Sequence, residues 1–192
     1  MEFGDASIGA TSLAGSLLVA SPTLDDPNFM RSVILLLDHD ADGALGIILN
    51  RPSEIAAGDA LPQWADVASE PAVVHVGGPV TPQVVVCLGR LRVASAPAGW
   101  TPLAGTIGAV DLETEPEELV GALDGLRLFA GYAGWGAGQL EMELRLGGWL
   151  VVAAEADDAF TADPDTLWSR VLRRQGGELA MLHTMPIDPT QN

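Results

Sequence analysis

The sequence predicts a single domain of the mixed α+β class. Apolar runs typical of β-strands precede, separate and follow segments of helical periodicity, without a steady alternation of strand and helix. The chain has 192 residues, 48% of them hydrophobic, which is enough for one substantial core. We therefore expect a flexible tail at residues 1–12, the domain at residues 13–183 and a frayed end at residues 184–192.

The strands are predicted from short apolar runs bounded by turn residues. The runs at residues 32–37 and 44–49 are apolar without alternation, which indicates strands covered on both faces in the centre of a sheet. The acidic stretch at residues 38–43 between them indicates a hairpin turn. Strands are expected at residues 15–20, 32–37, 44–49, 73–76, 84–93, 107–112 and 149–154, and a further strand-like run starts near residue 126 and leads into Gly131.

Helices are predicted where capping residues meet helical periodicity. Thr114 and Glu117 have the spacing of a capping box, for a helix that ends near residue 123. A second helix is expected at residues 139–146. Asp163 and Pro164 indicate the start of a third helix, which Gly176 ends. Residues 56–67 have weak helical character, and residues 94–106 are expected to form a loop.

Charge and cysteine content narrow the functional classes. The net charge is −17, with 26 acidic residues against nine arginines and no lysine. Such a charge repels nucleic acid, so direct nucleic-acid binding is disfavoured. The single cysteine, Cys87, allows no intrachain disulfide and favours a reducing, cytoplasmic location. No apolar segment reaches the roughly 18 residues needed to span a bilayer, so no membrane association is expected.

A glycine-rich stretch around Trp135 is the most informative feature of the chain. Gly131, Gly134, Gly136 and Gly138 are too many for ordinary turns and indicate a special conformation or a close approach of backbones. Their spacing differs from the dinucleotide fingerprint. We interpret the stretch as a rigid corner of the scaffold that holds no cofactor.

The loop at residues 38–43 partly matches a calcium site. Asp38, Asp40, Asp42 and Gly43 follow the first half of a calcium-binding loop, but the closing glutamate is missing. A hairpin turn therefore explains the acidic residues better. His39 within it is interpreted as a solvated turn residue rather than a metal ligand or pH-responsive group. No metal site and no cofactor are predicted.

No catalytic signature is visible in the chain. His75 lies in an apolar strand, where a hydrogen-bonded structural histidine is favoured over a general base. Cys87 is placed in mid-strand and His183 in the C-terminal tail. The five tryptophans are scattered, and packing explains them more simply than base stacking.

Several motifs together carry a family resemblance. They are GSLLVASP at residues 15–22, DPNFMRSV at 26–33, GALGIILNRP at 43–52, GGPV at 77–80 and GYAGWGAGQLEME at 131–143. In order and spacing, the chain resembles the AlgH/YqgE family of bacterial proteins, with Ala137 where many members carry proline. The resemblance implies a single domain with a bifurcated, partly barrel-like sheet flanked by helices. It implies no established reaction, although members often bear the label of transcriptional regulator.

A groove between two of these motifs is the predicted site. Polar and aromatic residues at strand ends, next to glycine turns, favour a pocket. Arg51 could bind a carboxylate or phosphate, or pair with Glu141. The candidate groove residues are Asn50, Arg51, Tyr132, Trp135, Gln139 and Glu141.

The functional prediction is a non-catalytic binding or regulatory module that acts through an unidentified protein partner, on an exposed apolar-aromatic surface. One alternative is an enzyme or nucleotide-binding protein with its site around residues 131–139. A second alternative is a regulator that contacts DNA directly, for which Arg170, Arg173 and Arg174 are the available basic residues. The sequence leaves the oligomeric state open.

Overall fold

The computed structural model describes residues 12–185. Of the two predicted tails, only Ser12, Thr184 and Met185 fall within this range, so the rest of those predictions lies outside the described residues. The strands are β1 (Ser16–Ala20), β2 (Val33–Asp40), β3 (Gly43–Ile48), β4 (Pro52–Ala56), β5 (Val73–Val76), β6 (Val80–Leu91), β7 (Trp100–Ala104), β8 (Ile107–Val110), β9 (Leu123–Gly136) and β10 (Trp149–Ala153).

The helices lie mostly in the second half of the chain. They are α1 (Ala57–Ala60), α2 (Pro116–Val120), α3 (Gln139–Arg145), α4 (Leu167–Gln175) and α5 (Gly177–Met181), with 3₁₀ turns η1 (Pro62–Val67), η2 (Pro164–Thr166) and η3 (Leu182–Thr184).

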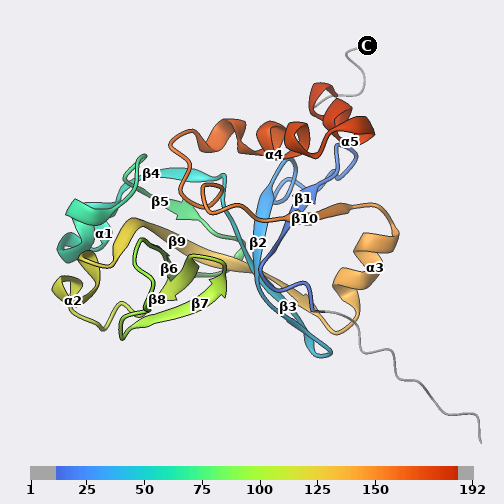
Figure 1. Ribbon diagram of the computed structural model, residues 1–192. Coiled ribbons are helices and arrows are strands. Elements are labelled where there is room, and N and C mark those ends of the chain that lie inside the picture. Colours follow the sequence, from blue (N-terminus) through green and yellow to red (C-terminus); the bar gives the residue numbers. More distant parts are fainter. Residues whose placement is uncertain (1–11, 186–192) are drawn as a thin grey trace, which may run out of the picture.

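The strands form one curled and largely antiparallel sheet, in the order β10-β1-β2-β3-β9-β6-β8-β7 (Figure 1). It is bifurcated along β9. Residues 133–136 of β9 pair with β3, whereas residues 129–130 pair in parallel with β5, which in turn pairs with β4. The α+β class and the bifurcated sheet are therefore confirmed.

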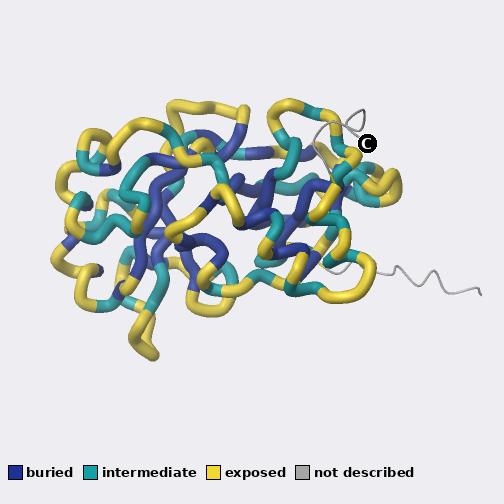
Figure 2. Tube along the Cα trace, turned by 90° about the horizontal axis from the view of Figure 1, so that it is seen from above, coloured by how far each residue is buried: buried dark blue, intermediate teal, exposed yellow. Residues whose placement is uncertain are grey.

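Both faces of the central strands are buried, as their unbroken apolar runs predicted. In β2, Val33 and Leu35 belong to one core cluster, and Ile34 and Leu36 belong to another. Helix α4 covers the first cluster with Leu167, Trp168, Val171 and Leu172, whereas α3 contributes Leu140 to the second. The Trp168 indole N–H donates to the Ala20 carbonyl oxygen at 2.8 Å, which fixes α4 against β1. Figure 2 shows the buried strands in the middle of the molecule and the exposed loops around them.

Close backbone contacts explain several glycines of the glycine-rich motifs. A Cβ atom on Gly77 would lie 2.3 Å from the Gly131 carbonyl oxygen, and one on Gly78 would lie 2.2 Å from the Tyr132 carbonyl group. A Cβ atom on Gly43 would lie 2.1 Å from the Trp135 carbonyl oxygen. Only glycine fits such contacts. Among the four glycines of the stretch, the predicted close approach is present at Gly131, where a Cβ atom would lie 2.5 Å from the Gly78 carbonyl oxygen. Cβ atoms on Gly134 and Gly136 would meet nothing nearer than 3.7 Å, so no close contact explains those two glycines.

The same stretch is strand rather than turn. Strand β9 continues through Gly131, Gly134 and Gly136, and the chain turns only at Gly138, which has a φ of 71° and precedes α3. Residues 38–40 likewise lie in β2, so the predicted six-residue turn is wrong and the hairpin turns at Ala41 and Asp42. In both regions the pairing with β3 continues, because residues 38–40 of β2 and residues 133–136 of β9 are each in register with that strand.

Two strands were not predicted. Strand β4 pairs with β5, and β7 pairs with β8 in the segment expected to be a loop. Trp100 at the start of β7 is 8% exposed and donates through its indole N–H to the Gly89 carbonyl oxygen at 3.1 Å. Pro52 and Pro102 mark these segments in the sequence as breaks, but proline is tolerated where a strand starts or lies at an edge.

The predicted helix starts are only partly correct. Helix α2 begins at Pro116 and ends at Val120, and no side-chain bond caps it, so the capping box at Thr114 is absent. Asp163 precedes the 3₁₀ turn η2, and α4 itself begins at Leu167. His183, placed in the tail by the sequence, lies in η3.

Candidate functional site

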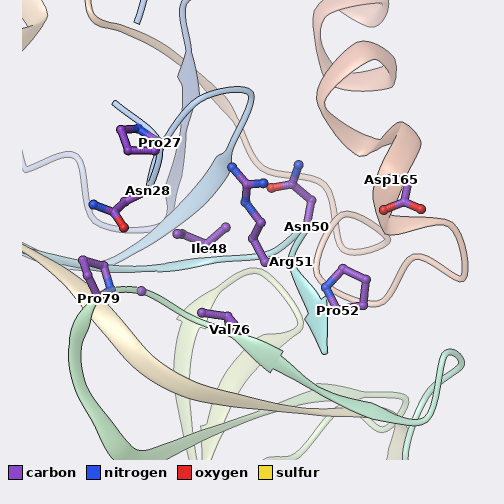
Figure 3. Close-up of a pocket in the computed structure, with 10 residues that line it drawn as sticks. Pro27, Asn28, Ile48, Asn50, Arg51, Pro52, Val76, Pro79 and Asp165 are labelled. Carbon is purple, nitrogen blue, oxygen red and sulfur yellow. The ribbon is translucent and has the colours of Figure 1, made fainter. Parts of the chain in front are cut away.

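A cavity of about 470 Å³ lies where the end of β3 meets the β5–β6 connection (Figure 3). Small-molecule sites usually have volumes of about 300 to 1,000 Å³, so its size suits a small ligand. Its polar lining residues are Asn28, Asn50, Arg51 and Asp165. Three of the family-like motifs thus meet at this cavity, because residues 26–33, 43–52 and 77–80 all contribute to its wall.

Asn50 holds the loop that forms one wall. Its Oδ1 atom accepts from the Val33 backbone N–H at 2.9 Å, and its Nδ2 atom donates to the Arg31 carbonyl oxygen at 2.9 Å. Arg31 has a φ of 54°, a left-handed conformation that costs about 1 kcal/mol or more for a residue other than glycine. The Asn50 amide therefore keeps a strained corner in place and has few bonds left for a ligand.

Arg51 presents the positive charge of the cavity. One guanidinium nitrogen, Nη2, donates to the Met30 carbonyl oxygen at 2.6 Å, and its backbone carbonyl accepts from the Val76 N–H at 2.7 Å. The ion pairs between described residues do not include Arg51. A half-buried guanidinium held in this way can still donate to an anionic oxygen.

Asn28 and Asp165 flank Arg51 on opposite sides of the cavity in Figure 3. Both residues are exposed, and neither side chain makes a hydrogen bond or ion pair within the described part of the chain. The cavity thus carries a guanidinium and a carboxylate that are not paired with each other. Both remain available for an incoming molecule.

The remaining wall of the cavity is apolar and rigid. Ile48 is 2% exposed and Val76 is 45% exposed, and prolines 27, 52 and 79 line the wall beside them. Gly78 is buried against the Tyr132 backbone, so the glycine contact that divides the sheet also forms part of this wall. Such a wall loses little entropy when a ligand binds.

Four of the predicted groove residues do not line this cavity. The Tyr132 backbone packs against Gly78, and Tyr132 is in register with Val80 of β6. Trp135 is 6% exposed and packs edge-on to Trp149, with ring centroids 6.0 Å apart. All five tryptophans are at most 8% exposed, which confirms their interpretation as packing residues and means that no indole belongs to the expected exposed apolar-aromatic surface.

Trp135 and Gln139 belong to a structural cluster around Glu143. Its carboxylate accepts from the indole N–H groups of Trp135 at 3.0 Å and Trp149 at 2.8 Å, and from the Gln139 amide at 2.9 Å. Gln139 also accepts from the Gly136 backbone N–H at 3.1 Å. These side chains join α3 to β9 and β10.

Glu141 pairs with His39 and not with Arg51. The Glu141 Oε1 atom lies 2.9 Å from His39 Nε2, and His39 Nδ1 accepts from the Leu13 backbone N–H at 3.0 Å. Nε2 therefore carries the imidazole proton. Hydrogen bonds from its own backbone amide and from His39 lower the pKa of Glu141. His39 is 7% exposed and lies in β2, so its interpretation as a solvated turn residue is wrong.

The remaining candidate nucleophile and base are deeply buried. His75 is fully buried, and burial together with the nearby charge of Arg127 lowers its pKa to about 4. Its Nδ1 atom lies 3.3 Å from the Val73 carbonyl oxygen, as expected of a structural histidine. Cys87 is 2% exposed, and burial raises its pKa. Neither residue lines the cavity.

Comparison with known proteins identifies the family of the chain. The family model described as AlgH-like matches residues 17–180. The chain belongs to the AlgH-like family. A UPF0301 protein of Streptomyces coelicolor is 54% identical over 186 residues, covering 95% of this chain and 96% of that relative. A UPF0301 protein of Thermobifida fusca is 49% identical over 98% of this chain and its own full length.

Two solved structures share the AlgH-like fold. The crystal structure of protein DIP2367 from Corynebacterium diphtheriae matches with a TM-score of 0.87 and 32% identity, over 94% of this chain and 96% of that one. The solution structure of the AlgH protein from Pseudomonas aeruginosa matches with a TM-score of 0.65 and 28% identity, over 97% and 98% of the two chains.

Sequence reasoning found only part of the site in this AlgH-like chain. Asn28 and Pro79 stand inside motifs that carried the family resemblance, but nothing marked their side chains as cavity-lining. Asp165 has no sequence signal, because it reaches the cavity from η2, which follows β10 along the chain. Across residues 12–185, no helix has the length and apolarity that a membrane crossing requires.

Proposed function

We propose that this AlgH-like chain is a non-catalytic binding module of the cytoplasm, which recognises a protein partner through an exposed valine face beside the Arg51 cavity. The observation that carries the proposal is a row of apolar residues across three strands. Val76 on β5 and Val85 on β6 are both in register with Ala130 on β9, so their side chains share one face of the sheet.

This valine face is exposed. Val76 and Val85 are 45% and 38% exposed, and Val80, which is in register with Tyr132 two residues along β9 from Ala130, is 37% exposed. Single exposed apolar residues are common, but a contiguous group beside a cavity is typical of an interaction site. Val76 belongs both to the valine face and to the cavity, so a ligand in the cavity would contact the same surface as the partner.

The nucleotide-binding alternative has less support. The N-terminal end of α3 is occupied by the chain itself, because Gln139 accepts from the Gly136 N–H and Glu141 binds His39. Within residues 12–185, no aromatic side chain lines the cavity at Arg51, so a base would find no ring there to stack on. The buried positions of His75 and Cys87 favour binding over nucleophilic catalysis.

Direct DNA binding is also disfavoured. Arg174 pairs with Asp158 at 2.6 Å, and Arg170 donates to the Thr161 hydroxyl at 2.8 Å. The basic residues of α4 thus bond within the chain, and they do not offset the −17 charge. A protein partner fits the label of regulator better than a phosphodiester backbone does.

The valine face is tested by partner recovery with a matched pair of variants. Val85→Ser alters the face, whereas Val151→Ser alters an exposed valine on β10, which is 41% exposed. Each tagged variant is expressed in the native host, cross-linked in the cell and analysed by quantitative mass spectrometry. We expect Val85→Ser to lose the partner that the wild type and Val151→Ser both recover. Equal recovery by both folded variants would contradict the proposal.

A further inference from the structure

We propose that the Arg51 cavity binds a small zwitterion, such as a short unblocked peptide, with its carboxylate on Arg51 and its ammonium group on Asp165. This inference rests on the proposed function, since it names the ligand class of the cavity beside the valine face. The evidence is the arrangement of one cation, one anion and an apolar wall around a single cavity of about 470 Å³.

The anionic end is assigned to Arg51 and Asn28. Arg51 uses Nη2 on the Met30 carbonyl oxygen, and it has no carboxylate partner among the described residues. The tether to Met30 orients the guanidinium before a ligand arrives, which reduces the entropy that binding must cost. The Asn28 amide borders the same cavity and can supply a further donor to a carboxylate oxygen.

The cationic end is assigned to Asp165. Its exposed carboxylate lines the cavity on the side of Arg51 away from Asn28 (Figure 3). It makes no ion pair with any described residue, although the chain has arginines elsewhere. An ammonium group placed there would gain a charge-assisted hydrogen bond. A second anionic group there would be repelled.

The cavity wall offers apolar contacts to the body of the ligand. In Figure 3, Pro52 lies between Arg51 and Asp165, and Ile48 and Val76 lie on the side of Arg51 that faces Asn28. Burying aliphatic groups against them contributes about 25 cal/mol for each Å² removed from water. The charges of Arg51 and Asp165 cancel, so the cavity favours a ligand of zero net charge over a nucleotide or a dicarboxylate.

The experiment uses calorimetric titration of the full chain with three forms of the tripeptide Ala-Leu-Ala. One form is unblocked, one is N-acetylated and one is C-amidated. The variants are Arg51→Gln, Asn28→Ala and Asp165→Asn, with Glu113→Gln as the charge control because its exposed side chain lies outside the cavity lining. Thermal melts confirm that each variant is folded.

We expect the unblocked tripeptide to bind the wild type and the Glu113→Gln control about tenfold or more tightly than either blocked form. Asp165→Asn should lose the discrimination against the N-acetylated form and keep that against the C-amidated form. Arg51→Gln should show the reverse, and Asn28→Ala should weaken both the unblocked and the N-acetylated form.

Two results would overturn the inference, and they differ in meaning for the proposed function. Equal binding of all three forms, lost in Arg51→Gln, would leave a ligand cavity but disprove the zwitterion. Absence of binding by every form at millimolar concentration would remove the ligand class altogether. The proposed partner surface would still be tested separately, by partner recovery with the Val85→Ser variant.

Discussion

Two buried nitrogen atoms show how single residues constrain this chain. His75 Nε2 and Arg127 Nε are both buried and have no hydrogen-bond partner among the described residues. Arg127 is 1% exposed and donates to the carbonyl oxygens of Ala159 and Glu70, and burial lowers its pKa to about 10. A second positive charge on His75 beside it is therefore strongly unfavourable.

This arrangement predicts a loss of stability in acid. The pKa of His75 is lowered from 6.5 to about 4, so between these values the unfolded chain binds a proton that the folded chain does not. Stability contributed by neutral His75 is thus intact above pH 6.5 and is lost as the pH falls towards 4, by about 1.4 kcal/mol per pH unit. The loss levels off below the folded-state value.

The measurement is the free energy of unfolding by urea across this pH range, for wild type and His75→Gln. The glutamine variant lacks the titrating group, so the difference between the two proteins should shrink as the pH falls. Parallel curves for the two proteins would contradict the assignment. The other histidines are present in both proteins and cancel in the comparison.

Cys87 gives a second prediction at the residue scale. It is the only cysteine of the chain, it is 2% exposed, and burial raises its pKa. Because the thiolate is the reactive form, a thiol reagent such as DTNB should not label the native protein and should label it rapidly in urea. Labelling of the native protein at the rate of a free thiol would show that β6 opens locally.

At the scale of elements, Glu143 joins one helix to two strands. It binds both buried indole N–H groups, so Glu143→Ala should leave two donors unsatisfied and lower the free energy of unfolding by about 3 kcal/mol. Met142→Ala on the same helix removes a side chain that is 49% exposed and should change stability by less than about 1 kcal/mol. Urea denaturation measures both, and equal effects would contradict the proposed role of the carboxylate.

The contact between Gly78 and β9 gives the second prediction at this scale. A Cβ atom there would lie 2.2 Å from the Tyr132 backbone, so Gly78→Ala should destabilise the protein by about 3 kcal/mol or more. At Gly121 a Cβ atom meets nothing within 4 Å, and Gly121→Ala is the matched control. If both variants unfold at nearly the same temperature as the wild type, the close contact between Gly78 and β9 does not contribute to stability.

Across the whole molecule, the sequence predicted the fold class and the central strands better than the ends of elements. The runs of β2 and β3 are apolar on both faces because α3 and α4 cover opposite sides of the sheet, and that burial is visible in the residues themselves. The glycines of β9 were harder to interpret. The role of Gly131 depends on contacts with Gly77 and Gly78, which are distant in sequence, so local patterns cannot show it.

Of the residues that line the cavity, the sequence predicted only those that stand in a recognisable local motif. Asn50 and Arg51 were identified because they follow a strand within a recognisable motif, and both line the cavity. Trp135 and Glu141 were misplaced, since their partners Glu143 and His39 become neighbours only when α3 packs on the sheet. Asp165 arrives from a separate element, so its contribution required the tertiary structure.

Methyl NMR on the full chain shows whether the Arg51 cavity is a ligand site. The protein is labelled on Ile and Val methyl groups and titrated with unblocked Ala-Leu-Ala. We expect saturable shifts of the methyl signals of Ile48 and Val76, which line the cavity, and no shift of Val151 on β10. Unchanged Ile48 and Val76 signals, or equal shifts at Val151, would contradict it.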